Sequence, residues 1–222
     1  MNATPAGILR EIEDITGFLM EKGLIDDQTW PYRHDGPDNT VEIRYPSALS
    51  GATVLRDRPY SITYNELLTA RSFNFRMLDG ALIQMGYTFT GPDLAAGRLA
   101  FLPSPDLSEY QNDPELYDSD PIFADMLDRR VVTVPVRFDF DTREGVMADV
   151  IHPASHLTLG QYMNCRIAAT AALTPGLFVE FILRSFYNTA SRMHSEGLPM
   201  RGHRFDSTIT DAERLLVHVG VP

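Results

Sequence analysis

The sequence has little of what small secreted proteins and membrane proteins depend on. Cys165 is the only cysteine among 222 residues, so neither an intrachain disulfide nor a cysteine-rich zinc site can form. No apolar run approaches the roughly 18–20 residues that a bilayer span requires. The first residues lack a basic segment followed by an unbroken apolar stretch, so we do not expect a signal peptide. We expect a cytoplasmic protein that does not enter a membrane.

Positive charge is also scarce. The chain has 19 Lys and Arg against 30 Asp and Glu, for a formal net charge of −11. Contacts to phosphate depend on Lys and Arg, so this balance disfavours tight unaided binding to nucleic acid, although a local basic patch would be compatible with it. The stretch 105–128 holds eight acidic residues and no Lys or Arg. We expect it to be an irregular acidic insertion.

Several short catalytic motifs are missing. The sequence has no Walker A lysine loop, no G-x-G-x-x-G, no G-x-S-x-G and no H-E-x-x-H. These patterns place phosphates, a nucleophilic serine or zinc in four large enzyme classes. Their absence argues against a P-loop NTPase, a dinucleotide enzyme, an α/β-hydrolase and a zincin.

The apolar residues that are present predict one α+β domain over 1–222. We expect a curved antiparallel sheet of about five or six strands packed on a long apolar C-terminal helix, with an N-terminal amphipathic helix and a C-terminal appendage over 195–222. Apolar spacing and capping residues predict helices over 4–22, from Thr63, over 121–130, over 174–188 and from Thr210. Alternation predicts strands over 40–45, 72–78, 81–89, 98–102, 131–141, 157–159 and 165–170. Asp79 and Gly80 are the residues that a tight type I′ hairpin turn prefers.

The densest polar group lies between residues 137 and 166. Arg137 and Asp139 share one strand face, His152 and His156 follow within HPASH, and Arg166 comes next. Two imidazoles can act as an acid and base pair, and a guanidinium can stabilise an anionic transition state. Asp139, or Asp141 on the same strand face, could orient an imidazole or hold a divalent metal ion. These residues would suit phosphodiester cleavage, with or without metal.

The same residues also fit structural roles. A His-Pro pair begins a turn, and the imidazole there often caps backbone groups. Arg137 and Asp139 would then be ion partners on a hydrated face, which contribute little to stability. The polar face of the hairpin is open to the same two readings, because a face of this kind carries a ligand in some proteins and only water in others. Its members are Asn74, Arg76, Gln84 and Thr88.

Five segments carry a resemblance to a known family: LDGALIQMGYTF, GRLAFLPSP, RFDFD, HPASHLTLGQYMNCRI and LTPGLFVEFILRSFYNTA. In this order they resemble a bacterial domain-of-unknown-function family (number 2290), from about Ile8 to Ala190. The resemblance implies a role beside a helicase in anti-phage defence loci. Motif and chemistry together mark two sets of candidates. The catalytic candidates are His152, His156, Arg166 and Asp139, and the ligand-binding candidates are Gln84, Tyr87, Arg98 and Arg137.

Our first hypothesis is a defence component that acts with a helicase or other NTPase on nucleic acid, as a nuclease subunit. Because the chain is acidic, nucleic acid would bind mainly within the complex. The alternative is a non-catalytic adaptor that binds and controls the helicase. A third hypothesis is a small-ligand sensor that uses the hairpin face.

Overall fold

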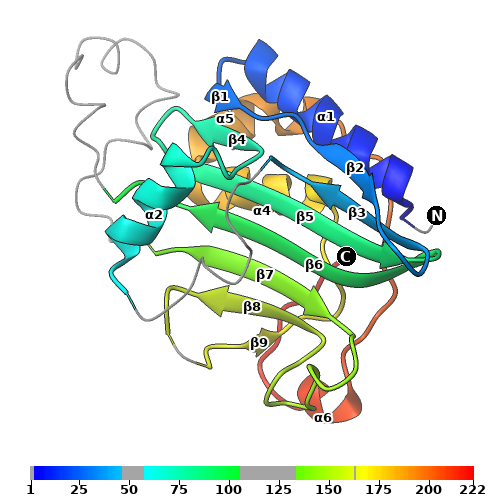
Figure 1. The fold of residues 1–222 in the computed structure, drawn as a ribbon. Helices are drawn as coiled ribbons and strands as arrows, with labels where there is room; N and C mark the ends of the chain where they lie inside the picture. The colour runs from blue at the N-terminus through cyan, green and yellow to red at the C-terminus, as the bar shows by residue number, and fades with distance from the viewer. Residues whose placement is uncertain (1–2, 47–57, 106–133, 163) are drawn as a thin grey trace.

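An antiparallel sheet dominates the structure, a computed structural model that describes residues 3–46, 58–105, 134–162 and 164–222. Its nine strands are β1 (Ile25–Gln28), β2 (Tyr32–Asp35), β3 (Thr40–Arg44), β4 (Phe75–Met77), β5 (Leu82–Thr90), β6 (Asp93–Leu102), β7 (Val136–Asp141), β8 (Ser155–Leu159) and β9 (Ile167–Ala168). The order is β1-β4-β5-β6-β7-β8-β9, and β3 pairs with the far end of β5 and carries β2 (Figure 1). The expected five or six strands are therefore too few.

Helices cover the two faces of the sheet unequally. They are α1 (Pro5–Glu21), α2 (Tyr60–Thr69), α4 (Pro175–Phe186), α5 (Asn188–His194), the short 3₁₀ helix η4 (Ser195–Gly197) and α6 (Asp211–Arg214). Helices α1 and α4 pack on one face and form the main core with it. Helix α2 forms a smaller core on the other face, near Leu82 and Leu102. No helix in the described ranges has the length and hydropathy needed to cross a bilayer.

Helix α1 forms where its sequence predicts. The Thr4 hydroxyl accepts a hydrogen bond from the Gly7 N–H, and Pro5 occupies the first helical position, which suits its fixed φ and missing N–H. The apolar residues recur on one stripe and are fully buried against the sheet: Ile8, Ile12, Ile15 and Leu19. Gly23 has a φ of 64° just beyond the helix, the left-handed conformation that ends many helices.

Helix α4 is shorter and less enclosed than its composition predicts. Thr174 caps it as expected, but it ends at Phe186 rather than at residue 188. One face, with Phe178 and Ile182, is buried in the core. Phe181 is only partly buried, and Phe186 is 37% exposed. Apolar residues occupy nearly the whole circumference of this helix in the sequence, yet only one face is buried, because α1 also covers this side of the sheet.

Helix α2 begins three residues earlier than expected. Thr63 and Glu66 have capping-box spacing, yet Thr63 lies inside the helix and is buried. Pro59 precedes the first residue and makes no side-chain cap. The Glu66 carboxylate instead forms a bidentate ion pair with Arg58, whose two Nη atoms donate hydrogen bonds of 2.6 and 2.7 Å. A real capping box occurs in α6, where Thr210 and Glu213 cap each other as predicted.

The predicted hairpin is present, but its turn is of a different type. The Met77 N–H donates a hydrogen bond to the Ala81 carbonyl at 2.8 Å, and the Gly80 N–H donates one to the Met77 carbonyl at 2.9 Å. The loop therefore has three residues, and only Gly80 has a positive φ, of 84°. A type I′ turn needs positive φ at both central residues. The Asp79 side chain accepts a bond from the Ala81 N–H instead. Phe73, within the strand predicted over 72–78, precedes β4 and joins the core under α2.

The strands that alternation missed lie in the polar stretch after α1. All four residues of β2 are exposed, so no apolar period marks the strand, and pairing with β3 alone defines it. Asp38 and Asn39 join β2 to β3 with φ of 54° and 57°, as a type I′ turn requires. The predicted helix over 121–130, the acidic stretch after Pro105 and the first residues of the strand predicted over 131–141 lie outside the described residues.

The C-terminal residues run back along the body of the structure. Phe205 stacks on Tyr87 with ring centroids 6.1 Å apart. The Arg204 carbonyl accepts a hydrogen bond from the Ala3 N–H. Val219 forms a parallel bridge with Ala169. The residues of this stretch that pack on the same core as the sheet are Leu198, Phe205, Val219 and Val221.

Candidate functional site

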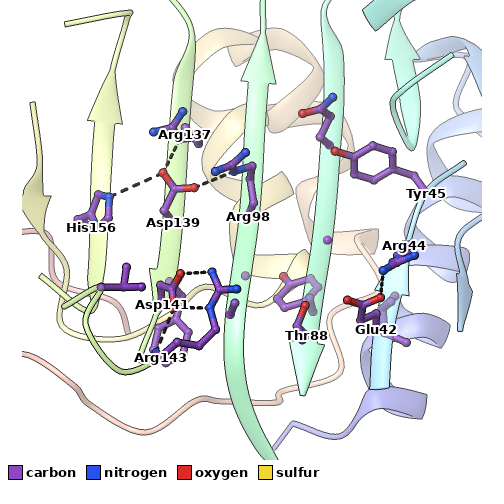
Figure 2. Close-up of a pocket in the computed structure, with 18 of the residues that line it drawn as sticks. Glu42, Arg44, Tyr45, Thr88, Arg98, Arg137, Asp139, Asp141, Arg143 and His156 are labelled. Atoms are coloured by element: carbon purple, nitrogen blue, oxygen red, sulfur yellow. Dashed lines mark hydrogen bonds and ion pairs between the residues drawn. The ribbon is translucent and has the colours of Figure 1, made fainter. Parts of the chain in front are cut away.

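A concave pocket of about 620 Å³ lies on the open face of the sheet, opposite α1 and α4 (Figure 2). Strand register builds it from three rows of neighbours across β5, β6, β7 and β8. The rows are Gln84-Ala100-Arg137-Thr158, Gly86-Arg98-Asp139-His156 and Thr88-Ala96-Asp141. Gly86 and Ala96 carry little or no side chain, so the sheet surface at these positions forms a recessed pocket floor. The pocket is thus a consequence of register and of small residues at these positions.

Asp139 is the centre of the middle row. Its carboxylate accepts a hydrogen bond from Arg98 Nε at 3.0 Å and a second, shorter one from Arg137 Nε (Figure 2). His156 Nε2 lies 3.7 Å from the same carboxylate. One negative charge is therefore shared by two guanidinium groups and faces one imidazole.

Two further ion pairs occupy the rim. Arg143 Nε donates to Asp141 Oδ1 at 2.9 Å, and Arg44 pairs with Glu42 on the far side (Figure 2). The sequence reasoning did not select Arg143, Glu42 or Arg44. Alternation over the predicted strand 40–45 could have placed Glu42 and Arg44 on one face, but nothing in it showed that β3 pairs with β5.

Arg166 adds a cation without an ion pair. Its Nη1 donates to Asn164 Oδ1 at 3.2 Å, and no carboxylate among the described residues lies within ion-pair distance. In the described part of the chain, five arginines and three carboxylates line the pocket. Two positive charges therefore lack a matching carboxylate there, on a chain with a net charge of −11.

Like charges repel one another within the arginine cluster. Burial lowers the pKa of the Arg137 guanidinium; the Asp139 carboxylate raises it, while the charges of Arg98 and Arg166 lower it further. Arg137 Nη1 is also buried without a hydrogen-bond partner. Such a donor costs about 1–3 kcal/mol when it stays unpaired. An anion in the pocket would relieve both penalties.

The two histidines meet edge to face beside this cluster. Their ring centroids are 5.1 Å apart, with an interplanar angle of 67°. His156 is buried, and its Nδ1 lies 2.9 Å from the Pro153 carbonyl oxygen. Burial lowers the pKa of His156, and the hydrogen bond to Pro153 and the Asp139 carboxylate only partly offset this. The imidazole is therefore neutral at neutral pH, with Nδ1 protonated toward Pro153.

All eight residues selected from the sequence line this pocket, but they do not contribute equally. The Tyr87 ring lies in the core on the helix-covered face, where its hydroxyl donates to the Leu173 carbonyl at 3.0 Å. Its side chain is therefore structural. Gln84 is buried at the inner end of the pocket, and Tyr45, which the sequence reasoning missed, lines it too.

The arrangement is poorly suited to a metal ion. No group of three or more His, Cys, Asp or Glu with metal-binding geometry occurs in the described ranges. Of the two residues expected to hold a divalent ion, Asp139 is already bonded by two arginines and Asp141 is paired with Arg143. Cations prefer carboxylates that are not neutralised in this way.

The comparisons with known proteins give one relation. No curated protein and no solved structure matches the chain. A family model described as "Uncharacterized conserved protein (DUF2290)" matches residues 24–221. The match starts later than the resemblance expected from about Ile8 and extends beyond Ala190, so it leaves out α1 and includes the C-terminal residues that pack on the core. The chain belongs to this domain-of-unknown-function family, number 2290.

Proposed function

We propose that the arginine-lined pocket binds phosphate groups of nucleic acid, and that the chain is the nucleic-acid-binding subunit of a bacterial anti-phage defence system that includes a helicase. The observation that carries the binding proposal is the excess of two guanidinium charges in a pocket of an otherwise acidic chain. Guanidinium groups bind phosphate oxygens with paired, charge-assisted hydrogen bonds. The helicase and the defence context rest on the family resemblance alone.

The rest of the chain sets a limit on this binding. A net charge of −11 repels a polyanion at long range, so few phosphates can be engaged at once. We expect the isolated chain to bind single strands with micromolar affinity. The helicase would supply the remaining phosphate contacts.

Arg166 offers the sharpest test, since it makes no ion pair with a described residue. Arg166→Gln should weaken binding of a fluorescein-labelled single strand about 10- to 100-fold, because a charge-assisted hydrogen bond contributes about 1.5–3 kcal/mol. The slope of log affinity against log salt concentration should decrease by roughly one, as expected for the loss of one phosphate contact. Arg10→Gln is the matched control: it makes the same charge change at an exposed position on α1, across the sheet. Equal affinities for the two variants would refute the proposal.

Phosphodiester cleavage is a second candidate function, favoured by the histidine pair. Neutral His156 has an unprotonated Nε2 facing the pocket region of Asp139 and Arg166, so it could accept a proton from water. His156→Asn should then abolish cleavage by the assembled complex and leave strand affinity within about twofold. Unchanged cleavage would restrict the site to binding.

The helicase would dock on a separate apolar surface. Ile151, Leu215 and Val217 are 74%, 88% and 92% exposed, on two neighbouring turns. The turns are joined by a hydrogen bond of 3.3 Å from the Val150 N–H to Glu213 Oε1. Exposed apolar groups of this kind are typical of protein interfaces. Leu215→Ser with Val217→Ser should abolish co-purification with the proposed helicase partner and leave strand binding unchanged. Retained co-purification would exclude this surface.

A further inference from the structure

A buried hydrogen-bond acceptor at the inner end of the pocket has no partner. Gln84 is 1% exposed, and its Nε2 donates to the Ser72 carbonyl at 2.5 Å. Because Ser72 presents a carbonyl, the amide nitrogen must face it and Oε1 must point elsewhere. Gln84 Oε1 is buried without a hydrogen-bond partner. An unpaired buried acceptor is costly, so this oxygen is well placed to receive an N–H donor from a ligand.

An aromatic ring lies over the glycine next to this acceptor on the same strand face. The nearest atoms to a Cβ added at Gly86 would be the Ile43 carbonyl oxygen and Tyr45 Cε1, both at 3.8 Å. The Tyr45 ring thus extends from the β3 side toward β5 and lines the pocket (Figure 2). It is half-buried, so part of its surface remains accessible. A planar ring could stack there.

The cations lie on the other side of the acceptor. Gln84 and Arg137 occupy the same row, separated by Ala100 on β6. Two strand spacings correspond to about 10 Å, a span that one nucleotide bridges from base edge to phosphate. Arg137 Nη1, buried without a hydrogen-bond partner, marks the phosphate end of that span.

We propose that the pocket recognises one unpaired nucleotide, whose base stacks on Tyr45 and donates an N–H to Gln84 Oε1 while its phosphate binds Arg137 and Arg166. This inference rests on the proposed phosphate binding and adds the substrate class: single-stranded rather than duplex nucleic acid. In a duplex the base faces are stacked and the N–H donors are engaged in pairing. Proteins that bind single strands commonly combine a cationic groove with aromatic side chains in this way.

The test compares two single strands of equal length, one of thymidines and one of abasic sugars that carry the same phosphates. The wild-type chain should bind the thymidine strand roughly tenfold more tightly than the abasic strand, as stacking on one aromatic ring allows. Gln84→Met keeps the length of the side chain and removes the acceptor. It should weaken thymidine-strand binding about threefold to tenfold and leave abasic-strand binding unchanged.

Tyr45 supplies an independent variant and its own control. Tyr45→Leu should bring the thymidine strand down to the affinity of the abasic strand, whereas Tyr45→Phe keeps the ring and should retain the difference. Should Gln84→Met fail to fold, as judged by its thermal melt, this pair decides the question. Equal wild-type affinity for both strands would overturn the nucleotide site and leave the phosphate proposal standing. Absence of binding to either strand would overturn both.

Discussion

Phe178 and Phe181 provide a matched test of how the core is arranged. They lie three residues apart on α4, and both rings contact Phe138 edge to face, at 6.2 and 5.4 Å between centroids. Phe178 is fully buried, whereas Phe181 is only partly buried. Truncation to alanine therefore removes the same atoms at a fully buried site and at a partly buried site.

Phe178→Ala should lower the free energy of unfolding by about 3–5 kcal/mol, the range for a fully buried phenylalanine. For a domain of this size that corresponds to a decrease in Tm of roughly 6–20 °C. Phe181→Ala should cost less than about 3 kcal/mol, because its ring already has contact with solvent. Urea unfolding followed by circular dichroism measures both changes. If Phe181→Ala is as destabilising as Phe178→Ala, Phe181 is not the less buried of the two rings.

Three further outcomes follow from particular residues. Gly80→Ala should destabilise the chain by about 1–3 kcal/mol in thermal melts, because φ is 84° and the added Cβ would lie 3.1 Å from Ser104 Cβ; an unchanged Tm would contradict the turn. His156 has a pKa lowered by burial, so the unfolded chain takes up its proton first, and stability should decline as pH falls below its ordinary value of about 6.5. In urea titrations between pH 7.5 and 5.5, His156→Asn should show a smaller decline, and identical curves would refute this. Gly86→Val should displace the Tyr45 ring and weaken strand binding without a large change in Tm, whereas full binding would show that the pocket floor is not used.

Much of the site was accessible to sequence reasoning because strand alternation fixes which side chains share a face. Alternation in the segment from Val136 to Asp141 correctly directed Arg137 and Asp139 away from the core. The same rule applied to Tyr87 would have placed it beside Met85 and Phe89, in the core where it lies. Its selection came from the motif, not from its position on the strand.

The remaining features depend on pairing between distant segments, which a local period does not encode. Arg98 meets Asp139 only because β6 pairs with β7, 41 positions away in the chain. Glu42 and Arg44 reach the rim because β3 pairs with the far end of β5. The type I′ turn was expected at Asp79–Gly80, yet both positive φ angles occur at Asp38 and Asn39. Asp-Gly also suits the three-residue loop, so the dipeptide alone could not distinguish them.

A crystal structure of the chain with a short thymidine strand would show directly whether the pocket binds a nucleotide. We expect one phosphate in contact with Arg137 Nη1 and the Arg166 guanidinium, with the adjoining base against Tyr45 and its N–H directed at Gln84 Oε1. A strand bound elsewhere on the surface, with these four side chains in their present positions and the pocket holding only water, would contradict this expectation.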